Sequence, residues 1–134
     1  MPSIFSRIVN RDLPAHIVAE SDEYLAFLDI SPLAEGHTLV IPKKEEDYIF
    51  DLDDETYEGA FRFAKKVGKA IEKVIPCERM GLTVIGLEVP HAHIHLIPIN
   101  AVDDMNFGRV KLSPTNEELA ATALKIKNSF KELY

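Results

Sequence analysis

The sequence predicts an α+β protein: an antiparallel sheet of about five strands with one long helix packed across it and short helices at both ends. Three observations predict this class. Residues 53–75 repeat apolar side chains at helical spacing, short runs of β-forming residues flank that segment, and the links between consecutive runs are short. Short links join antiparallel neighbours, whereas parallel strands need long crossover connections. A chain of 134 residues is expected to form a single domain over residues 1–134.

The first half of the chain is expected to hold one short helix and three strands. Apolar residues between positions 4 and 9 fit one face of a short helix that ends near Pro14. Runs of β-forming residues predict strands at 16–20, 24–28 and 37–41. Turn-forming residues separate these runs, which fits short connections between neighbouring strands.

The clearest predicted element is the long helix at about residues 53–75. Its apolar and small residues form one stripe at helical spacing, and acidic residues at its start favour the positive end of the helix dipole. Pro76 is expected to end it. Two further strands are predicted at residues 81–84 and 91–97, joined by a short link.

A last helix is predicted near residues 114–133. Two starts fit the sequence, because Pro114 can occupy the first turn behind Ser113, or Thr115 and Glu118 can form a capping box. The apolar face of this helix consists of Leu119, Ala123, Ile126, Phe130 and Leu133.

Composition and charge exclude several classes of partner. The chain carries 22 acidic and 15 basic residues, a net charge of −7, so it should repel nucleic acid polymers and anionic membranes. A small anionic substrate stays possible, because local hydrogen-bond donors can outweigh the net charge. The one cysteine, Cys77, can form no intramolecular disulfide, and no apolar run approaches the ~20 residues of a membrane span. We therefore expect a cytoplasmic protein.

Three of the five histidines, His91, His93 and His95, alternate along one predicted strand. Successive side chains of a strand point to opposite faces, so these imidazoles share one side and apolar residues share the other. Adjacent imidazoles cannot all be charged at low cost, so the row should titrate as a coupled set with a neutral member near neutral pH. A structural role alone gives no reason for such a row.

Two functions fit the histidine row. Neutral imidazole is a common metal ligand, but His91 and His95 would start about 13 Å apart, too far to close easily on one tetrahedral ion. Two neighbours could still bind a metal with help from His37 or a carboxylate. Nucleophilic catalysis fits better, because an unprotonated imidazole nitrogen can attack phosphorus. Only His93 has a histidine on each side, which makes it the predicted nucleophile, with the others positioning the phosphate or handling the leaving group's proton.

Several blocks of the chain resemble the histidine triad family. His91–Ile97 matches the family's H-x-H-x-H-x-x signature, in which x is mostly apolar. The other blocks that resemble the family, in the family's order, are residues 4–9, 13–15, 24–32 and 36–43. The resemblance therefore extends over most of residues 4–98.

The resemblance implies a role for each site residue. His93 would be the nucleophile that forms a nucleotidyl-histidine intermediate, and His91 and His95 would contact the phosphate. His37 would support the triad from the neighbouring strand. Asp29 would bind the ribose, because a carboxylate accepts protons from two vicinal hydroxyls. The apolar walls of the base and sugar pocket would be Phe5, Ile8, Leu13, Phe27 and Ile30.

The resemblance also implies a reaction and an assembly. The expected activity is that of a nucleotidyl hydrolase or transferase acting on the α-phosphate of a nucleoside phosphate derivative, such as a phosphoramidate or a dinucleoside polyphosphate. No cofactor or metal is expected. A homodimer would form through the long helix and a neighbouring strand. The alternatives are a nucleotide-binding module with little catalysis and a histidine-based metal-binding protein.

Two departures from the family pattern bear on the mechanism. The loop before the triad is compressed and lacks the family's amide residue, and Glu88 stands near a Ser/Thr position, where a carboxylate would repel phosphate. Some relatives bind zinc through an initial Cys-x-x-Cys and a later histidine. This chain has Ser3 and Ser6 at the first pair, and Glu45 and Glu46 where the histidine would stand. Hydroxyls are poor zinc ligands compared with thiolates, so no structural zinc is expected.

Overall fold

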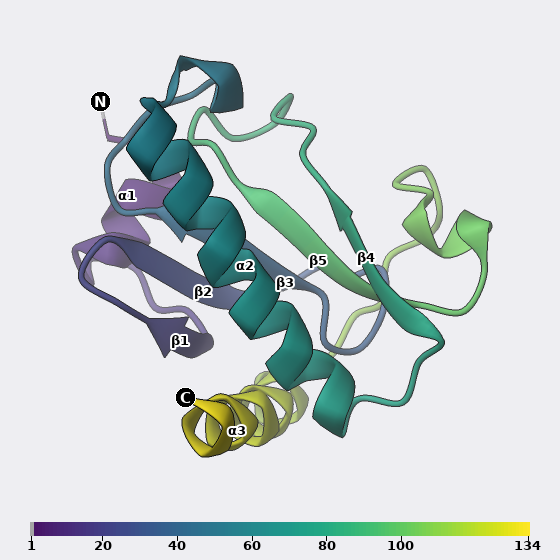
Figure 1. Ribbon diagram of the computed structural model, residues 1–134. Coiled ribbons are helices and arrows are strands. Elements are labelled where there is room, and N and C mark those ends of the chain that lie inside the picture. Colours follow the sequence, from purple (N-terminus) through teal and green to yellow (C-terminus); the bar gives the residue numbers. More distant parts are fainter. Residues whose placement is uncertain (1) are drawn as a thin grey trace.

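The computed structural model describes residues 2–134 and confirms the predicted α+β class, with five antiparallel strands and three helices (Figure 1). The helices are α1 (Ile4–Val9), α2 (Asp54–Val74) and α3 (Asn116–Leu133). The strands are β1 (Ile17–Glu20), β2 (Tyr24–Leu28), β3 (Thr38–Pro42), β4 (Arg79–Thr83) and β5 (Ile94–Ile99). Short 3₁₀ turns at Ile49–Asp51 and Val102–Met105 precede α2 and follow β5. The strand order β1-β2-β3-β5-β4 makes β1 and β4 the edges of the sheet.

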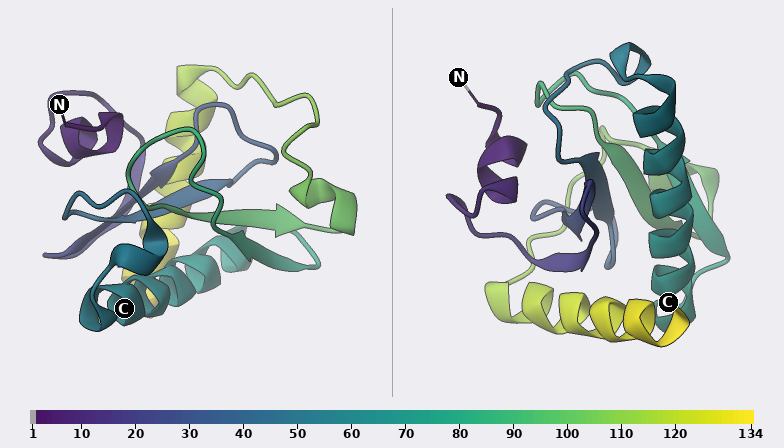
Figure 2. Two further views of the ribbon diagram at one scale, coloured as in Figure 1. Left: turned by 90° about the horizontal axis from the view of Figure 1, so that it is seen from above. Right: turned by 60° about the vertical axis from the view of Figure 1, so that its left-hand side comes forward.

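Helices cover the two faces of the sheet unequally. Both α2 and α3 pack on one face, whereas the short α1 lies on the other (Figure 2). Strand β2 is buried along its whole length because it lies between these layers. Its alternate residues Tyr24, Ala26 and Leu28 join the cluster beneath α2 and α3, while Leu25 and Phe27 join the cluster beneath α1. The face beneath α1 is the one on which the histidines gather.

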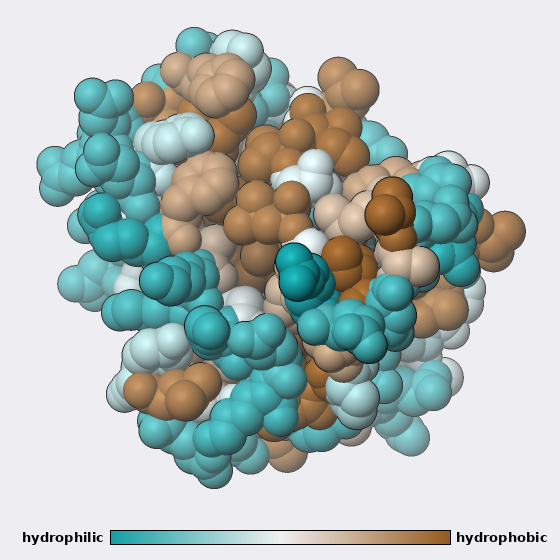
Figure 3. Space-filling view, turned by 45° about the vertical axis from the view of Figure 1, so that its right-hand side comes forward, coloured by the Kyte–Doolittle hydropathy of each residue, from teal (hydrophilic) through white to brown (hydrophobic). Residues whose placement is uncertain are grey.

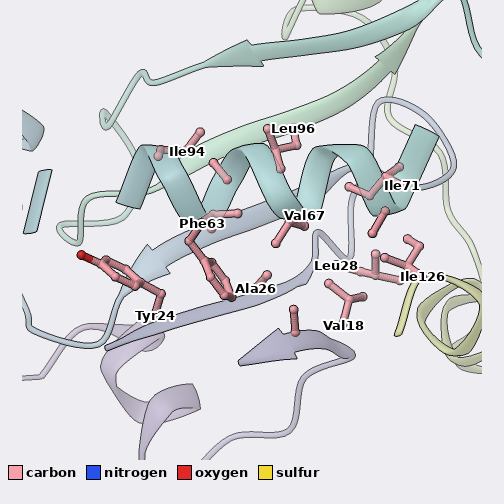
Figure 4. Packing of buried hydrophobic residues seen from close by; sticks show 14 of the residues in the cluster. Val18, Tyr24, Ala26, Leu28, Phe63, Val67, Ile71, Ile94, Leu96 and Ile126 are labelled. Carbon is pink, nitrogen blue, oxygen red and sulfur yellow. The ribbon is translucent and has the colours of Figure 1, made fainter. Parts of the chain in front are cut away.

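The long helix presents one apolar stripe to the sheet, as the sequence predicts. Figure 4 shows Phe63, Val67 and Ile71 of this helix pointing onto the side chains of the strands. Val67 and Ile71 have no solvent exposure, whereas Lys65, Lys66 and Lys69 of the same helix are exposed. Within residues 2–134, none of the helices combines the length and the apolar character that crossing a membrane requires.

A close approach of α2 to β2 depends on Gly59. A Cβ atom at this position would lie 2.1 Å from the Tyr24 hydroxyl oxygen, which donates a hydrogen bond to the Thr56 carbonyl over 3.0 Å. Only a residue without a side chain leaves room for that hydroxyl. The contact positions the start of α2 against the first hairpin of the sheet.

Several predicted boundaries were wrong by a few residues. The last strand begins at Ile94 rather than His91, because the Ala92 N–H binds the Glu46 carbonyl and the chain before Ile94 is not paired in the sheet. The fourth strand begins two residues earlier than predicted, at Arg79. The last helix starts at Asn116, because the capping box of Thr115 rather than a proline in the first turn defines its start.

Candidate active site

Pairing of β3 with β5 brings four histidines into one cluster. His37 lies just before β3, and its ring centroid is 5.2 Å from that of His95. The rings of His93 and His95 are 4.9 Å apart, and the Phe5 ring of α1 lies 5.1 Å from that of His93. His37, His91, His93 and His95 are each at most 7% exposed. The predicted row of imidazoles is therefore a packed site on the α1 face of the sheet.

Backbone carbonyls determine the tautomers of His91 and His93. A carbonyl oxygen only accepts, so a ring nitrogen bound to one must carry the proton. His93 Nδ1 donates to the His91 carbonyl over 2.7 Å, which leaves the lone pair on His93 Nε2. His91 Nε2 donates to the Pro42 carbonyl over 2.8 Å, so its Nδ1 accepts from the Ser3 hydroxyl over 2.8 Å. Both nitrogens of His91 are thus bound by the protein, and neither is free for the phosphate contact that the resemblance implies.

A backbone N–H determines the tautomers of the other pair. The Leu33 N–H donates to His37 Nδ1 over 3.0 Å, so the proton of the neutral His37 ring is on Nε2. His37 Nε2 in turn donates to His95 Nδ1 over 3.0 Å, which leaves the proton of His95 on Nε2. Burial lowers the pKa of His37 to about 4, with a smaller contribution from Lys111, and burial lowers the pKa of His95 to about 3. Both rings are therefore neutral near neutral pH.

Asp29 lies at the end of β2 next to this pair. Its Oδ1 accepts from the Ser31 N–H over 2.8 Å, and its Oδ2 is 3.7 Å from His37 Nε2. Burial raises the pKa of Asp29, the Ser31 N–H opposes that shift, and the charge of Glu88 adds to it. Glu88, in the shortened loop before the triad, is exposed.

Asp29, His37 and His95 are close enough to bind a metal ion, because one ligand atom from each lies within 4.8 Å of the others. The hydrogen bonds argue against that use. His37 Nδ1 already accepts from the Leu33 N–H, so His37 Nε2 carries a proton and has no lone pair for a metal. Metal binding at His37 Nε2 would move the ring proton to Nδ1, where it would face the Leu33 N–H instead of accepting from it. The two histidines fit a hydrogen-bonded pair, with Asp29 beside them, better than a metal centre.

An apolar wall borders the histidines under α1. The rings of Phe5 and Phe27 meet edge to face at 5.3 Å, and Ile8 and Leu13 pack in the same cluster. Four of the five predicted pocket residues thus lie together. The fifth, Ile30, is 69% exposed in the loop after β2 and lies outside the buried cluster.

The segment 101–111, whose place directly after the triad strand favours such a position, covers the site. The ring of Phe107 lies 4.8 Å from that of His95 and 6.0 Å from that of His37. Lys111 Nζ donates to the Phe107 carbonyl, and the Leu112 N–H binds the Pro32 carbonyl over 2.9 Å, which holds the segment across the loop after β2. No periodic pattern marks Phe107; its position after the triad strand was the only signal.

A cavity of about 310 Å³ adjoins the cluster. Asp29 and His37 line one side of it, and the loop after β2 and the start of α3 line the rest. It offers space next to Asp29 and His37, and His93 is not among the residues that line it.

Comparison with known proteins gives one consistent result. The HIT domain family matches residues 10–102 of the chain. An adenosine 5'-monophosphoramidase of Schizosaccharomyces pombe is 35% identical over 134 residues, which cover 98% of this chain and 100% of that protein. An uncharacterized HIT-like protein of Borreliella burgdorferi is 38% identical over 113 residues, covering 79% of this chain and 81% of that protein.

Solved structures agree with the sequence relatives. The crystal structure of a Hit-like protein from Bartonella henselae superposes with a TM-score of 0.82 at 32% sequence identity. The match covers 95% of each chain, so the whole arrangement of sheet, long helix and C-terminal helix is shared.

Proposed function

We propose that this chain, which belongs to the HIT domain family, is a nucleotide hydrolase that works through a covalent nucleotidyl-histidine intermediate. Two yeast relatives that bear the name adenosine 5'-monophosphoramidase support this activity. The acidic chain, with its net charge of −7, supports a small nucleotide rather than a nucleic acid polymer as substrate. A single HIT-like domain in the cytoplasm is part of the proposal, in keeping with the lone Cys77.

The observation that carries the proposal is a pair of free ring nitrogens. Among the hydrogen bonds of residues 2–134, His93 Nε2 and His95 Nε2 have no protein partner, whereas both nitrogens of His37 and His91 are bound. His93 Nε2 holds a lone pair, and His95 Nε2 holds a proton. A nucleophile and a hydrogen-bond donor on neighbouring rings can attack phosphorus and stabilise the charge that develops as the bond to the leaving group breaks.

The reaction follows from these two atoms in two steps. First, the lone pair of His93 Nε2 forms a bond to the α-phosphorus, and the bond from phosphorus to the leaving group breaks. The leaving group departs with that electron pair and takes up a proton from solvent water, while the His95 Nε2–H donates a hydrogen bond to it. Second, a water oxygen attacks the phosphorus and loses a proton to solvent, while the N–P bond breaks and its pair returns to His93. The products are a nucleoside monophosphate and the protonated leaving group.

The hydrogen bonds behind the two reacting rings support their tautomers throughout both steps. The His91 carbonyl keeps the proton of His93 on Nδ1, and this bond strengthens as Nε2 becomes bonded to phosphorus and the ring turns cationic. His37 donates to His95 Nδ1, which keeps the His95 proton on Nε2, where it can donate a hydrogen bond. We assign the ribose hydroxyls to Asp29, and the base to the apolar wall that includes Phe5.

The test is intact-protein mass spectrometry of wild type and His93→Ala, mixed with adenosine phosphoramidate and quenched early. Wild type should show a transient gain of one adenylyl group and release of AMP, and His93→Ala should show neither. Calorimetric titration with AMP serves as the control that the variant still binds nucleotide. Nucleotide binding by wild type without an adduct or turnover would point instead to a binding module.

We further propose a homodimer through β4 and the adjacent face of α2. Strand β4 is a sheet edge with unpaired backbone groups, whereas the other edge, β1, packs against α3. Leu82 on β4 is 47% exposed and Leu87 in the following loop is 88% exposed. Figure 3 shows apolar side chains gathered on this side of the molecule. Sedimentation of wild type should give twice the chain mass of 15.1 kDa, and Leu82→Glu should give one; a monomeric wild type would refute the dimer.

A further inference from the structure

A closed hydrogen-bond network joins the start of α1 to the triad, away from the reacting atoms. Glu45 Oε1, from the loop after β3, accepts from the Ser3 N–H and from the Ser6 hydroxyl, each over 2.6 Å. The Ser3 hydroxyl oxygen lies 2.8 Å from His91 Nδ1. Three segments of the chain, separated by up to 88 residues, meet in these contacts. We call Ser3, Ser6, Glu45 and His91 the clasp.

Only one arrangement of protons satisfies every hydrogen bond of the clasp. His91 Nε2 donates to the Pro42 carbonyl, so His91 Nδ1 can only accept, and the Ser3 hydroxyl must donate to it. The Ser3 oxygen accepts in turn from the Ser6 N–H over 2.9 Å, which is the cap of α1. The bonds from Ser3 and Ser6 lower the pKa of Glu45, so that carboxylate is charged near neutral pH and accepts from both.

The clasp stands where some relatives would hold a structural zinc, and its residues do not fit that metal. A zinc ion needs lone pairs that face it, but His91 Nδ1 already accepts the Ser3 proton and hydroxyls replace both thiolates. Hydrogen bonds connect the same segments instead. The connection between α1 and the triad therefore exists in this chain without a metal.

The clasp and the helix α1 that it holds contact His93 from two directions. The carbonyl of His91, held by the clasp, accepts the Nδ1 proton of His93 and thereby keeps the lone pair on Nε2. Phe5, in the first turn of α1, packs against His93 with ring centroids 5.1 Å apart and against His91 at 6.0 Å. A displacement of Ser3 would therefore move the His91 carbonyl and the Phe5 ring, which both restrain His93.

We infer that Ser3 is a positioning residue for the nucleophile: its hydroxyl donates to His91 Nδ1, holds the His91 ring and backbone in place and through the His91 carbonyl orients His93, with Glu45 anchoring Ser3. This inference rests on the proposed function for its kinetic consequence, but the tautomers can be measured without any substrate. The competing explanation is that Ser3 only caps a short helix. Thr115 offers a matched control, because its hydroxyl caps α3 in the same way and reaches no histidine.

The experiment compares Ser3→Ala, Ser3→Thr and Thr115→Ala with wild type in thermal unfolding and in phosphoramidate turnover. Ser3→Ala should lower kcat about tenfold with KM within about twofold, as the loss of outer-shell hydrogen bonds does elsewhere. Ser3→Thr keeps the hydroxyl and should restore kcat. Thr115→Ala should lose thermal stability and keep kcat. If Ser3→Ala also loses only stability and keeps kcat, Ser3 is a helix cap and the inference is overturned.

Long-range ¹H–¹⁵N spectra of ¹⁵N-histidine-labelled protein test the same point independently of turnover. Wild type should show His91 protonated at Nε2 and His93 protonated at Nδ1, and Ser3→Ala should shift the ring-nitrogen resonances of His93, because the His91 carbonyl that binds its Nδ1 proton moves. An unchanged histidine spectrum in folded Ser3→Ala would overturn the inference. If wild type proves inactive, the proposed function fails while these spectra still decide the role of Ser3.

Discussion

Lowering the pH should destabilise the fold through its buried neutral histidines, and His37 offers the sharpest case. Burial holds the pKa of His37 at about 4, against 6.5 for the unperturbed side chain. A histidine whose pKa is lower in the folded state binds fewer protons there than in the unfolded chain. The free energy of unfolding therefore keeps its full value above about pH 7 and falls as the pH drops from 6.5 toward 4.

The magnitude at pH 5 follows from linkage. At that pH the unfolded imidazole is almost fully protonated and the folded His37 is almost neutral, so His37 lowers the free energy of unfolding by about 2 kcal/mol relative to neutral pH. His95, whose pKa is lowered to about 3, contributes about 2 kcal/mol more in the same range. Neither folded ring is charged at pH 5, so their mutual repulsion does not enter this value.

The assay is urea unfolding of wild type and His37→Gln at pH 7 and pH 5. Glutamine is neutral at both pH values and can accept from the Leu33 N–H and donate to His95, so the variant removes the titration and keeps the hydrogen-bonding capacity. The loss of unfolding free energy between the two pH values should be about 2 kcal/mol smaller in His37→Gln. An equal loss in both proteins, with equal urea slopes, would refute the argument that His37 is buried in its neutral form.

Three further predictions concern the packing around the site. Gly59→Ala should lower the unfolding free energy by about 1–3 kcal/mol, because its Cβ would meet the Tyr24 hydroxyl; a Tm equal to wild type would show that Tyr24 can move away without cost. Ile71→Ala should cost about 2–5 kcal/mol and Ile71→Val about 0.5–1.5 kcal/mol in urea unfolding, since Ile71 is fully buried between α2 and the sheet; similar losses for both variants would contradict tight packing there. Phe107→Ala should expose His95 and raise its pKa from about 3 toward 6.5, as followed by NMR titration of the ring; an unmoved pKa would mean that the segment after β5 does not shield the site.

Much of the fold could be predicted from local patterns. The apolar stripe of residues 53–75 determines a helix and the face that it buries, because helical period and burial both depend on near neighbours in the chain. The boundaries of β5 could not be predicted in this way. His91 to His93 look like strand residues by alternation, yet their backbone groups bind Val89, Glu46 and a histidine ring rather than a neighbouring strand.

The candidate site, too, could be predicted only in part from the sequence. Spacing in the sequence places three imidazoles on one side, and the resemblance to the histidine triad family adds His37 and Asp29. Sequence reasoning assigned His91 to the phosphate, but its two ring nitrogens are taken by Pro42 and Ser3. The contact of Phe107 with the site could not be predicted, because a single aromatic residue in an irregular segment carries no periodic signal.

The sequence by itself therefore determined the class of fold, the order of its elements and the row of histidines, since these follow from residue types a few positions apart. Only the tertiary structure decided which nitrogen of each ring carries the proton. That choice depends on the His91 carbonyl for His93, on the Leu33 N–H for His37 and, through His37, for His95. His37 and His95 are 58 residues apart in the chain and become partners only where β3 pairs with β5. Hydrogen-bond partners of this kind are a property of three-dimensional register, which one-dimensional spacing does not contain.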